Sequence, residues 1–185
     1  MKVALMGVSG SGKDYLAKHL ISEHGFIRFS FSDQLKKLAH YIYPWLDIDY
    51  QPETKTLPLN ITLSTGEKIL SSPRDIWLSL NSLRHIEEHI FIRMLSEEIN
   101  TLNHACEKNI IITDIRSTNE LLWCKKNNFA IIYIEREGND YEKYEIDKYV
   151  IENKSKSDYT FNNASCGTGA FDMFFQEVFV SGQQK

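Results

Sequence analysis

Cysteine, long apolar runs and an excess of either charge are all scarce in this sequence. The three cysteines, Cys106, Cys124 and Cys166, stand far apart and form no CxxC pair. This spacing excludes a disulfide framework and a cysteine metal site, and it indicates reduced thiols in a cytosolic protein.

The apolar runs are too short for a membrane protein. The longest cover Asn109 to Thr113 and Phe129 to Ile134, far below the ~20 residues that span a bilayer. The apolar start, Met1 to Met6, is interrupted at once by glycine and so lacks a signal-peptide core. We therefore expect a cytoplasmic protein that does not bind a membrane.

The charges nearly balance, with 21 Lys and Arg against 25 Asp and Glu and a net charge of −4. We therefore expect no nucleic-acid partner, although a local basic pocket for a small anion is compatible with this balance. A hydrophobic fraction of 42% is ordinary for globular proteins, and 185 residues fit one domain over residues 1–185.

A glycine-rich loop near the start carries the strongest signal. It follows an apolar run, Lys2 to Met6, and precedes leucines at helical spacing that end at Gly25. Residues 7–13 match GxxxxGK between a strand and a helix. In such a loop, backbone N–H groups surround phosphate oxygens and the lysine reaches the outer phosphates. The motif therefore predicts nucleoside triphosphate binding at Lys13.

Acidic and basic residues next to that motif point to a metal and to a second phosphate. Asp14 stands where Ser or Thr usually holds Mg²⁺, and a carboxylate is the stronger ligand. Asp114 and Arg116 directly follow the buried run Asn109 to Thr113. Ligands of open α/β sheets bind outside the carboxyl ends of strands. We expect Asp114 to hold Mg²⁺ and Arg116 to bridge the donor and acceptor phosphates.

Alternating apolar runs and helical patterns predict a three-layer α/β/α fold with a parallel central sheet. Residues 58–71 interrupt this order as a small inserted hairpin, between prolines. The charged segment 136–157 is predicted to be a loop or lid. Strands are expected at 109–113, 129–134 and 159–161, and helices at 119–126 and 171–179.

Arginine is sparse, but its positions favour phosphate binding. Four of the six arginines, Arg74, Arg84, Arg116 and Arg136, flank predicted helix starts or strand ends. The planar guanidinium binds phosphate through two hydrogen bonds, whereas a lysine such as Lys36 acts as a point charge.

Five short motifs occur in the order seen in phage-type deoxynucleoside monophosphate kinases, and the chain resembles that family from about residue 3 to 178. They are Gly10-Ser-Gly-Lys-Asp14, Phe31-Ser-Asp-Gln-Leu-Lys36, Ser72-Pro-Arg74, Ile112-Thr-Asp-Ile-Arg116 with Asn119-Glu120, and Asp158-Tyr-Thr-Phe-Asn-Asn163. Animal-type phosphomevalonate kinases, a related branch, are similar. The resemblance implies an adenylate-kinase-like P-loop kinase that uses ATP and Mg²⁺ to convert deoxynucleoside monophosphates to diphosphates. If a phage encodes it, the compartment is the host cytoplasm.

Roles for individual residues follow from the loop and the resemblance together. The predicted ATP-binding residues are Gly7, Ser9, Gly10, Ser11, Gly12, Lys13, Asp14 and Tyr15. The predicted substrate-binding residues are Asp33, Lys36, Arg74, Arg84, Arg116 and Glu120, within an acceptor region of about 32–104 except for the last two. The predicted catalytic residues are Lys13, Arg116 and Arg136, and the predicted metal ligands are Asp14 and Asp114.

Two departures from the family pattern concern the base pocket and the lid. Leu80-Asn81-Ser82 lacks the family's glycine turn, and Tyr144-Glu145 is what remains of a His-x-Ser-Glu-like element. The lid holds one arginine, Arg136, with lysines as substitutes.

The expected mechanism is direct in-line attack by the acceptor phosphate on the γ-phosphorus. Phosphate monoesters lose their second proton near pH 6, so no general base is required. Three other functions remain open: the same fold acting on another small phosphate such as phosphomevalonate, a non-catalytic nucleotide-binding module, and a zinc peptidase. The last rests on His85-Ile-Glu-Glu-His89, an HxxEH match expected on one helical face. The expected partners are small nucleotides, with a homodimer left open.

Overall fold

The computed structural model describes residues 1–185 except 52, 104–107, 139–144, 165–166 and 182–185. The chain divides into two compact units. The sheet unit comprises Met1–Ser30 and Thr101–Lys185, and the helical unit comprises Phe31–Asn100. The helical unit begins and ends close to the acceptor region predicted at about 32–104.

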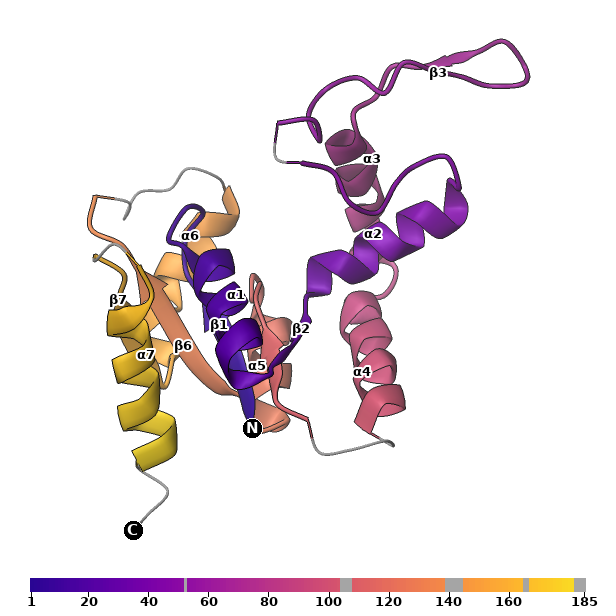
Figure 1. Ribbon diagram of the computed structural model, residues 1–185. Helices are drawn as coiled ribbons and strands as arrows, with labels where there is room; N and C mark the ends of the chain where they lie inside the picture. The colour runs from indigo at the N-terminus through magenta and orange to yellow at the C-terminus, as the bar shows by residue number, and fades with distance from the viewer. Residues whose placement is uncertain (52, 104–107, 139–144, 165–166, 182–185) are drawn as a thin grey trace. The chain divides into compact units, whose positions relative to one another are not determined.

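Five strands form the sheet at the centre of the sheet unit (Figure 1). They are β1 (Lys2–Met6), β2 (Ile27–Phe29), β5 (Ile110–Ile112), β6 (Ala130–Glu135) and β7 (Tyr159–Asn162). Their order is β2-β5-β1-β6-β7, and every neighbouring pair is parallel. Val3 pairs with Ile111 on one side and with Ala130 on the other. The predicted parallel sheet is confirmed.

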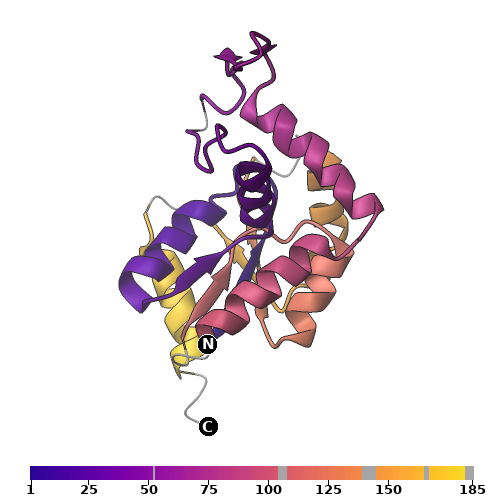
Figure 2. The ribbon, with the colours of Figure 1, turned by 90° about the vertical axis from the view of Figure 1, so that its right-hand side faces the viewer.

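Helices cover both faces of this sheet and complete the three predicted layers (Figures 1 and 2). Their bounds are α1 (Lys13–His24), α5 (Thr118–Lys126), α6 (Glu145–Glu152) and α7 (Gly169–Phe175), the last continued by a π-helical turn at Gln176–Val180. Helices α1 and α7 lie on one face, and α5 and α6 lie on the other.

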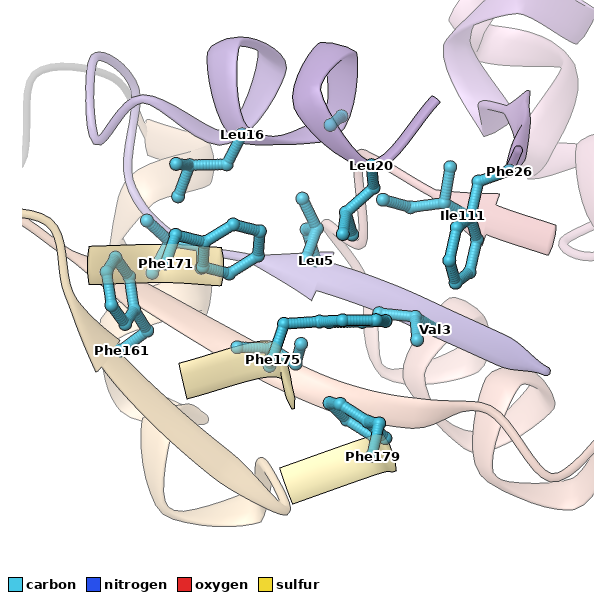
Figure 3. Close-up of a cluster of buried hydrophobic side chains, with 13 residues drawn as sticks. Val3, Leu5, Leu16, Leu20, Phe26, Ile111, Phe161, Phe171, Phe175 and Phe179 are labelled. Atoms are coloured by element: carbon cyan, nitrogen blue, oxygen red, sulfur yellow. The ribbon is translucent and has the colours of Figure 1, made fainter. Parts of the chain in front are cut away.

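The core between β1 and the α1–α7 face is built from aliphatic and phenylalanine side chains. Val3 and Leu5 alternate along β1 toward this face, where Leu16 and Leu20 of α1 meet them (Figure 3). Phenylalanines from the end of the chain close the cluster, with Phe171 and Phe161 ring centroids 5.0 Å apart. Alternation of this kind is what a strand with helices on both faces requires.

The helical unit has a small hydrophobic core, and one of its helices begins with a side-chain cap. Its elements are α2 (Phe31–Ile42), β3 (Ile61–Thr62), β4 (Lys68–Ile69), α3 (Pro73–Leu80), a 3₁₀ turn η1 (Asn81–His85) and α4 (Ile90–Asn103), whose last turn passes the unit boundary. Ala39, Leu46 and Trp77 are buried together. The antiparallel β3–β4 pair confirms the predicted hairpin. Ser72 caps α3 in a reciprocal capping box with Asp75.

The segment 136–157 differs from the predicted loop because its described part contains α6 and a 3₁₀ turn, η2 (Lys154–Lys156). Asp147 and Val150 are buried and stand three residues apart, which is helical spacing. Most of their neighbours are charged or polar and hide the pattern in the sequence. Lys143 and Tyr144 lie outside the described residues.

Two further expectations can be compared with the described part of the chain. Cys124 is a buried thiol, and burial raises its pKa, whereas Cys106 and Cys166 lie outside the described residues. Every helix among the described residues is too short or too polar to cross a bilayer.

The phenylalanine cluster provides a stability test. Phe171 is 1% exposed, so Phe171→Ala removes a buried ring and is expected to cost about 3–5 kcal/mol of unfolding free energy. Met173→Ala, on the same helix but 70% exposed, is the matched control and should change stability by less than ~0.5 kcal/mol. Denaturant unfolding followed by circular dichroism measures both. Equal losses would contradict the assigned core.

Candidate active site

The loop after β1 requires glycine because the backbone is packed closely. A Cβ at Gly7 would collide with the carbonyl oxygen of Ile134 in β6 and would lie 2.9 Å from Ser11 Oγ. Gly12 has φ of 93°, in the left-handed region, and a Cβ there would collide with the Asn163 amide. The loop therefore nests between β6 and the chain after β7, and α1 begins directly behind it.

Lys13 places its ammonium inside this loop. Nζ donates to the carbonyl oxygens of Gly7 at 2.6 Å and Val8 at 2.7 Å, and to Ser11 Oγ at 3.2 Å. The side chain is buried, and burial together with nearby Arg116 lowers the pKa of Lys13 to about 8. A positive charge is therefore held against the backbone of the loop, where a phosphate would be attracted.

Asp147 of α6 reaches the same loop. Its Oδ1 accepts from the Ser9 N–H at 2.8 Å and from the Ser9 hydroxyl at 3.1 Å. The carboxylate is 2% exposed and acts on Lys13 as an attractive charge. Sequence reasoning missed Asp147. The sequence offered no local signal for it, because its partner Ser9 lies 138 positions away.

Asn163 supports the loop from the other side. Its side-chain amide donates to the Ser11 carbonyl at 2.9 Å, and its own N–H donates to the Glu135 carbonyl at 2.7 Å. The residue ends the last of the five resemblance motifs but was assigned no role from the sequence. Its position explains why an asparagine stands there: one amide holds the loop to the end of β7.

Asp114 and Arg116 lie at the carboxyl end of β5, as predicted. Asp114 is buried and accepts from Ser30 Oγ at 2.7 Å. The charge of Asp114 raises the pKa of Lys13 while that of Arg116 lowers it, so both lie in the electrostatic neighbourhood of the ammonium. Ser30 is a further site residue that the sequence did not reveal, because its partner lies 84 positions away.

Among the other predicted residues of the sheet unit, three are exposed at the surface and Glu120 holds the turn before α5. Asp14, Tyr15 and Arg136 are exposed. Glu120 is 2% exposed, and its carboxylate accepts from the Arg116 N–H at 2.7 Å. This contact orders the turn that carries Arg116.

Four predicted acceptor residues belong to the helical unit. Lys36 Nζ lies 3.4 Å from Asp33 Oδ1 and 5.5 Å from the ring centre of Trp77. Arg84 donates from Nε to Asn81 Oδ1 at 3.0 Å, and its guanidinium lies over a phenylalanine ring. Arg74 is half-buried in the first turn of α3.

The prediction that the two histidines of the HxxEH match share one helical face is wrong. His85 closes η1, whereas His89 lies in a turn before α4 begins at Ile90. Both histidines are exposed. Glu87, between them, accepts two hydrogen bonds from Arg93, at 2.9 and 2.7 Å. The two imidazoles thus lack the shared helix on which the zinc-peptidase reading depended.

Comparison with known proteins agrees with this geometry. No family model matches the chain. Among solved structures, a dephospho-CoA kinase from Campylobacter jejuni shares the fold with a TM-score of 0.53 and 12% identity, over 95% of this chain and 96% of that one. This likeness shows that the chain has the fold of a P-loop kinase.

A curated relative defines the family more closely. A protein of Acanthamoeba polyphaga mimivirus is 30% identical in an alignment 151 residues long, and the alignment covers 74% of this chain and 74% of the relative. Its name, deoxynucleotide monophosphate kinase, is a provisional assignment. The chain belongs to the family of that viral protein, and a nucleotide-kinase-like function follows.

The packing of Gly7 gives a test of the loop. Gly7→Ala is expected to cost about 1–3 kcal/mol of stability, because the new methyl group must displace the β6 backbone. Gly169→Ala is the matched control, since a Cβ there meets open space. Thermal denaturation of both variants measures the difference. A Gly7→Ala protein as stable as the control would refute the close packing.

Proposed function

We propose that this chain transfers the γ-phosphate of ATP to a deoxynucleoside 5′-monophosphate, releasing ADP and the diphosphate. The observation that carries the proposal is that Asp114 and Arg116 follow β5, the parallel neighbour of β1, so they lie at the same sheet edge as the buried Lys13 ammonium. The name of the viral relative supports the acceptor class, and its family supports ATP as the donor.

In this proposal, the loop binds the phosphates of ATP. Backbone N–H groups from Ser9 to Lys13 donate to the phosphate oxygens, and Lys13 exchanges its carbonyl partners for the outer phosphates. In the structure, the Ser9 N–H donates to Asp147. A phosphate bound at Ser9 would therefore compete with the Asp147 carboxylate for this N–H group. Both are anions, which supports the view that this loop position favours negative charge.

Mg²⁺ fits the acids at this edge. Asp14 is exposed in the first turn of α1, and Asp114 is buried at the end of β5. Carboxylate oxygens are the ligands that Mg²⁺ prefers, so these two residues would hold it directly or through water. The ion would supply charge neutralisation on the phosphates of ATP.

The acceptor is bound by cations rather than activated by a base. Its phosphate is ionised at neutral pH, so it attacks the γ-phosphorus without losing a proton. Arg116 and Arg136 stabilise the charge that develops on the transferring group. Lys36, Arg74 and Arg84, with Asp33 and Glu120, are assigned to the acceptor.

A panel of acceptors tests the proposal directly. We expect ADP and a deoxynucleoside diphosphate to form in equal amounts from ATP, Mg²⁺ and at least one of the four common dNMPs or a modified dCMP, measured by ion-exchange chromatography. Ribonucleotides and phosphomevalonate complete the panel. Transfer to phosphomevalonate alone would contradict the acceptor class, and ATP binding without any transfer would favour a non-catalytic module.

Lys13→Ala tests the role of the ammonium. We expect kcat to fall by about 10²–10³-fold, as for loss of one group that stabilises transition-state charge. Lys18→Ala, an exposed lysine on the same helix, is the matched control and should retain activity. Unchanged turnover in Lys13→Ala would rule out the assigned mechanism.

The lowered pKa of Lys13 predicts a pH dependence of ATP affinity. Since the free protein loses this proton near pH 8 and bound ATP requires the ammonium, affinity falls as pH rises, by about tenfold from pH 7 to 9. The Lys13→Arg protein keeps its charge over this range. Its affinity for ATP should therefore not change with pH. Parallel pH profiles for the two proteins, measured by calorimetry, would contradict the prediction.

A further inference from the structure

Three side chains that could ligate a metal converge outside the phosphate loop. His19 and His24 come from α1, and Asp172 comes from α7. Asp172 Oδ1 lies 2.8 Å from His24 Nε2 and 3.3 Å from His19 Nε2. The three ligand atoms all lie within 4.8 Å of one another. Two imidazoles and one carboxylate thus point their ligand atoms at one small volume.

The surroundings hold the two imidazoles in place. The His24 ring packs against Phe175 with centroids 4.9 Å apart, and it meets the His19 ring edge-on at 6.0 Å. Helix α1 ends at His24, where Gly25 adopts φ of 65°. The Asn109 amide donates to the His24 carbonyl at 3.2 Å. Because the backbone and ring are both fixed, little conformational entropy is lost when a ligand binds.

The cluster is partly exposed to solvent, mainly at Asp172. The histidine side chains are 14% and 17% exposed, and the Asp172 side chain is 38% exposed. A metal here would take three protein ligands and complete its shell with water. That ligand count and exposure are typical of a tetrahedral site with one open position.

We propose that His19, His24 and Asp172 form a binding site for a divalent transition metal of the zinc class. In a tetrahedral site with metal–ligand bonds near 2.0–2.1 Å, ligand atoms stand about 3.3 Å apart. The two carboxylate–imidazole separations of 2.8 and 3.3 Å need only small side-chain rotations to reach that geometry. Imidazole nitrogens favour zinc, nickel and copper over magnesium and calcium, which separates this site from the proposed Mg²⁺ ligands.

The proposed site lies away from the glycine-rich loop of residues 7–13. Lys13 and His24 stand at opposite ends of α1, eleven residues and therefore about 16 Å apart along the axis. A metal would join the end of α1 to α7, which carries the phenylalanines of the core. It would therefore stabilise the sheet unit without touching the phosphates.

Metal titration of the full chain tests the proposal. After chelator treatment, Zn²⁺ should bind with one equivalent by calorimetry, and Co²⁺ should give the visible absorption of a tetrahedral site. At Zn²⁺ about 100 times above Kd, Tm should rise by about 5–10 °C. Neither readout uses the kinase reaction, so the result is independent of the proposed function.

Conservative variants locate the metal. His24→Gln and Asp172→Asn should each weaken Zn²⁺ binding by about 100-fold or more and abolish the cobalt spectrum. The matched control is the double variant His85→Gln/His89→Gln, exposed histidines of the helical unit, which should bind as the parent does. If circular dichroism shows that the His24→Gln protein does not fold, His19→Gln takes its place in the test.

Other outcomes overturn the proposal. Absence of stoichiometric zinc would leave the cluster as a hydrogen-bonded ion pair, with Tm unchanged by metal. Full binding by the Asp172→Asn and His24→Gln proteins would place any metal elsewhere, and loss of binding in the control alone would place it at His85 and His89.

Discussion

Parallel pairing of β1 between β5 and β6 is the constraint on which the rest of the sheet unit depends. Parallel strands end at the same edge, so residues that follow different strands meet there. Lys13 follows β1, Asp114 and Arg116 follow β5, and Arg136 follows β6. An antiparallel β5 would carry Asp114 and Arg116 to the opposite edge.

Several polar groups of the glycine-rich loop at residues 7–13 have hydrogen-bond partners within the chain. Lys13 donates to loop carbonyls, and Asp147 accepts from the Ser9 N–H and hydroxyl. Buried charges otherwise carry a large desolvation cost. Three carboxylates oppose that cost for Lys13 only in part, because burial and Arg116 still lower its pKa to about 8. In the proposed function, nucleotide binding exchanges these internal partners for phosphate oxygens. The loop geometry is thus prepared while its charges remain balanced.

Helix α1 carries a candidate site at each of its two ends. Its first residue is Lys13 and its last is His24, so the loop and the His19–His24–Asp172 cluster occupy opposite ends of one rigid element. Leu16 and Leu20, on the buried face between them, pack against β1 and the phenylalanines of α7 (Figure 3). The position of the loop and that of the proposed metal site therefore rest on the same packing.

Local signals in the sequence were sufficient for much of the fold. The all-apolar run of β5 and the glycine stop at Gly25 each act within a few residues, and both predictions are confirmed. The segment 136–157 was predicted to be a loop or lid, and its helix at 145–152 was not foreseen because charged neighbours conceal the buried Asp147 and Val150. The predicted HxxEH helix failed because i, i+4 spacing does not by itself make a helix.

The sequence by itself determined the phosphate loop, the parallel α/β class and Asp114 with Arg116 at a strand end. These depend on short-range patterns, such as glycine spacing and apolar runs, that operate in any context. Only the tertiary structure decided that Ser30 meets Asp114, that Asp147 meets Ser9, and that Asp172 meets two histidines of α1. Such contacts join residues 84 to 153 positions apart, and only the packed chain brings them within hydrogen-bonding distance.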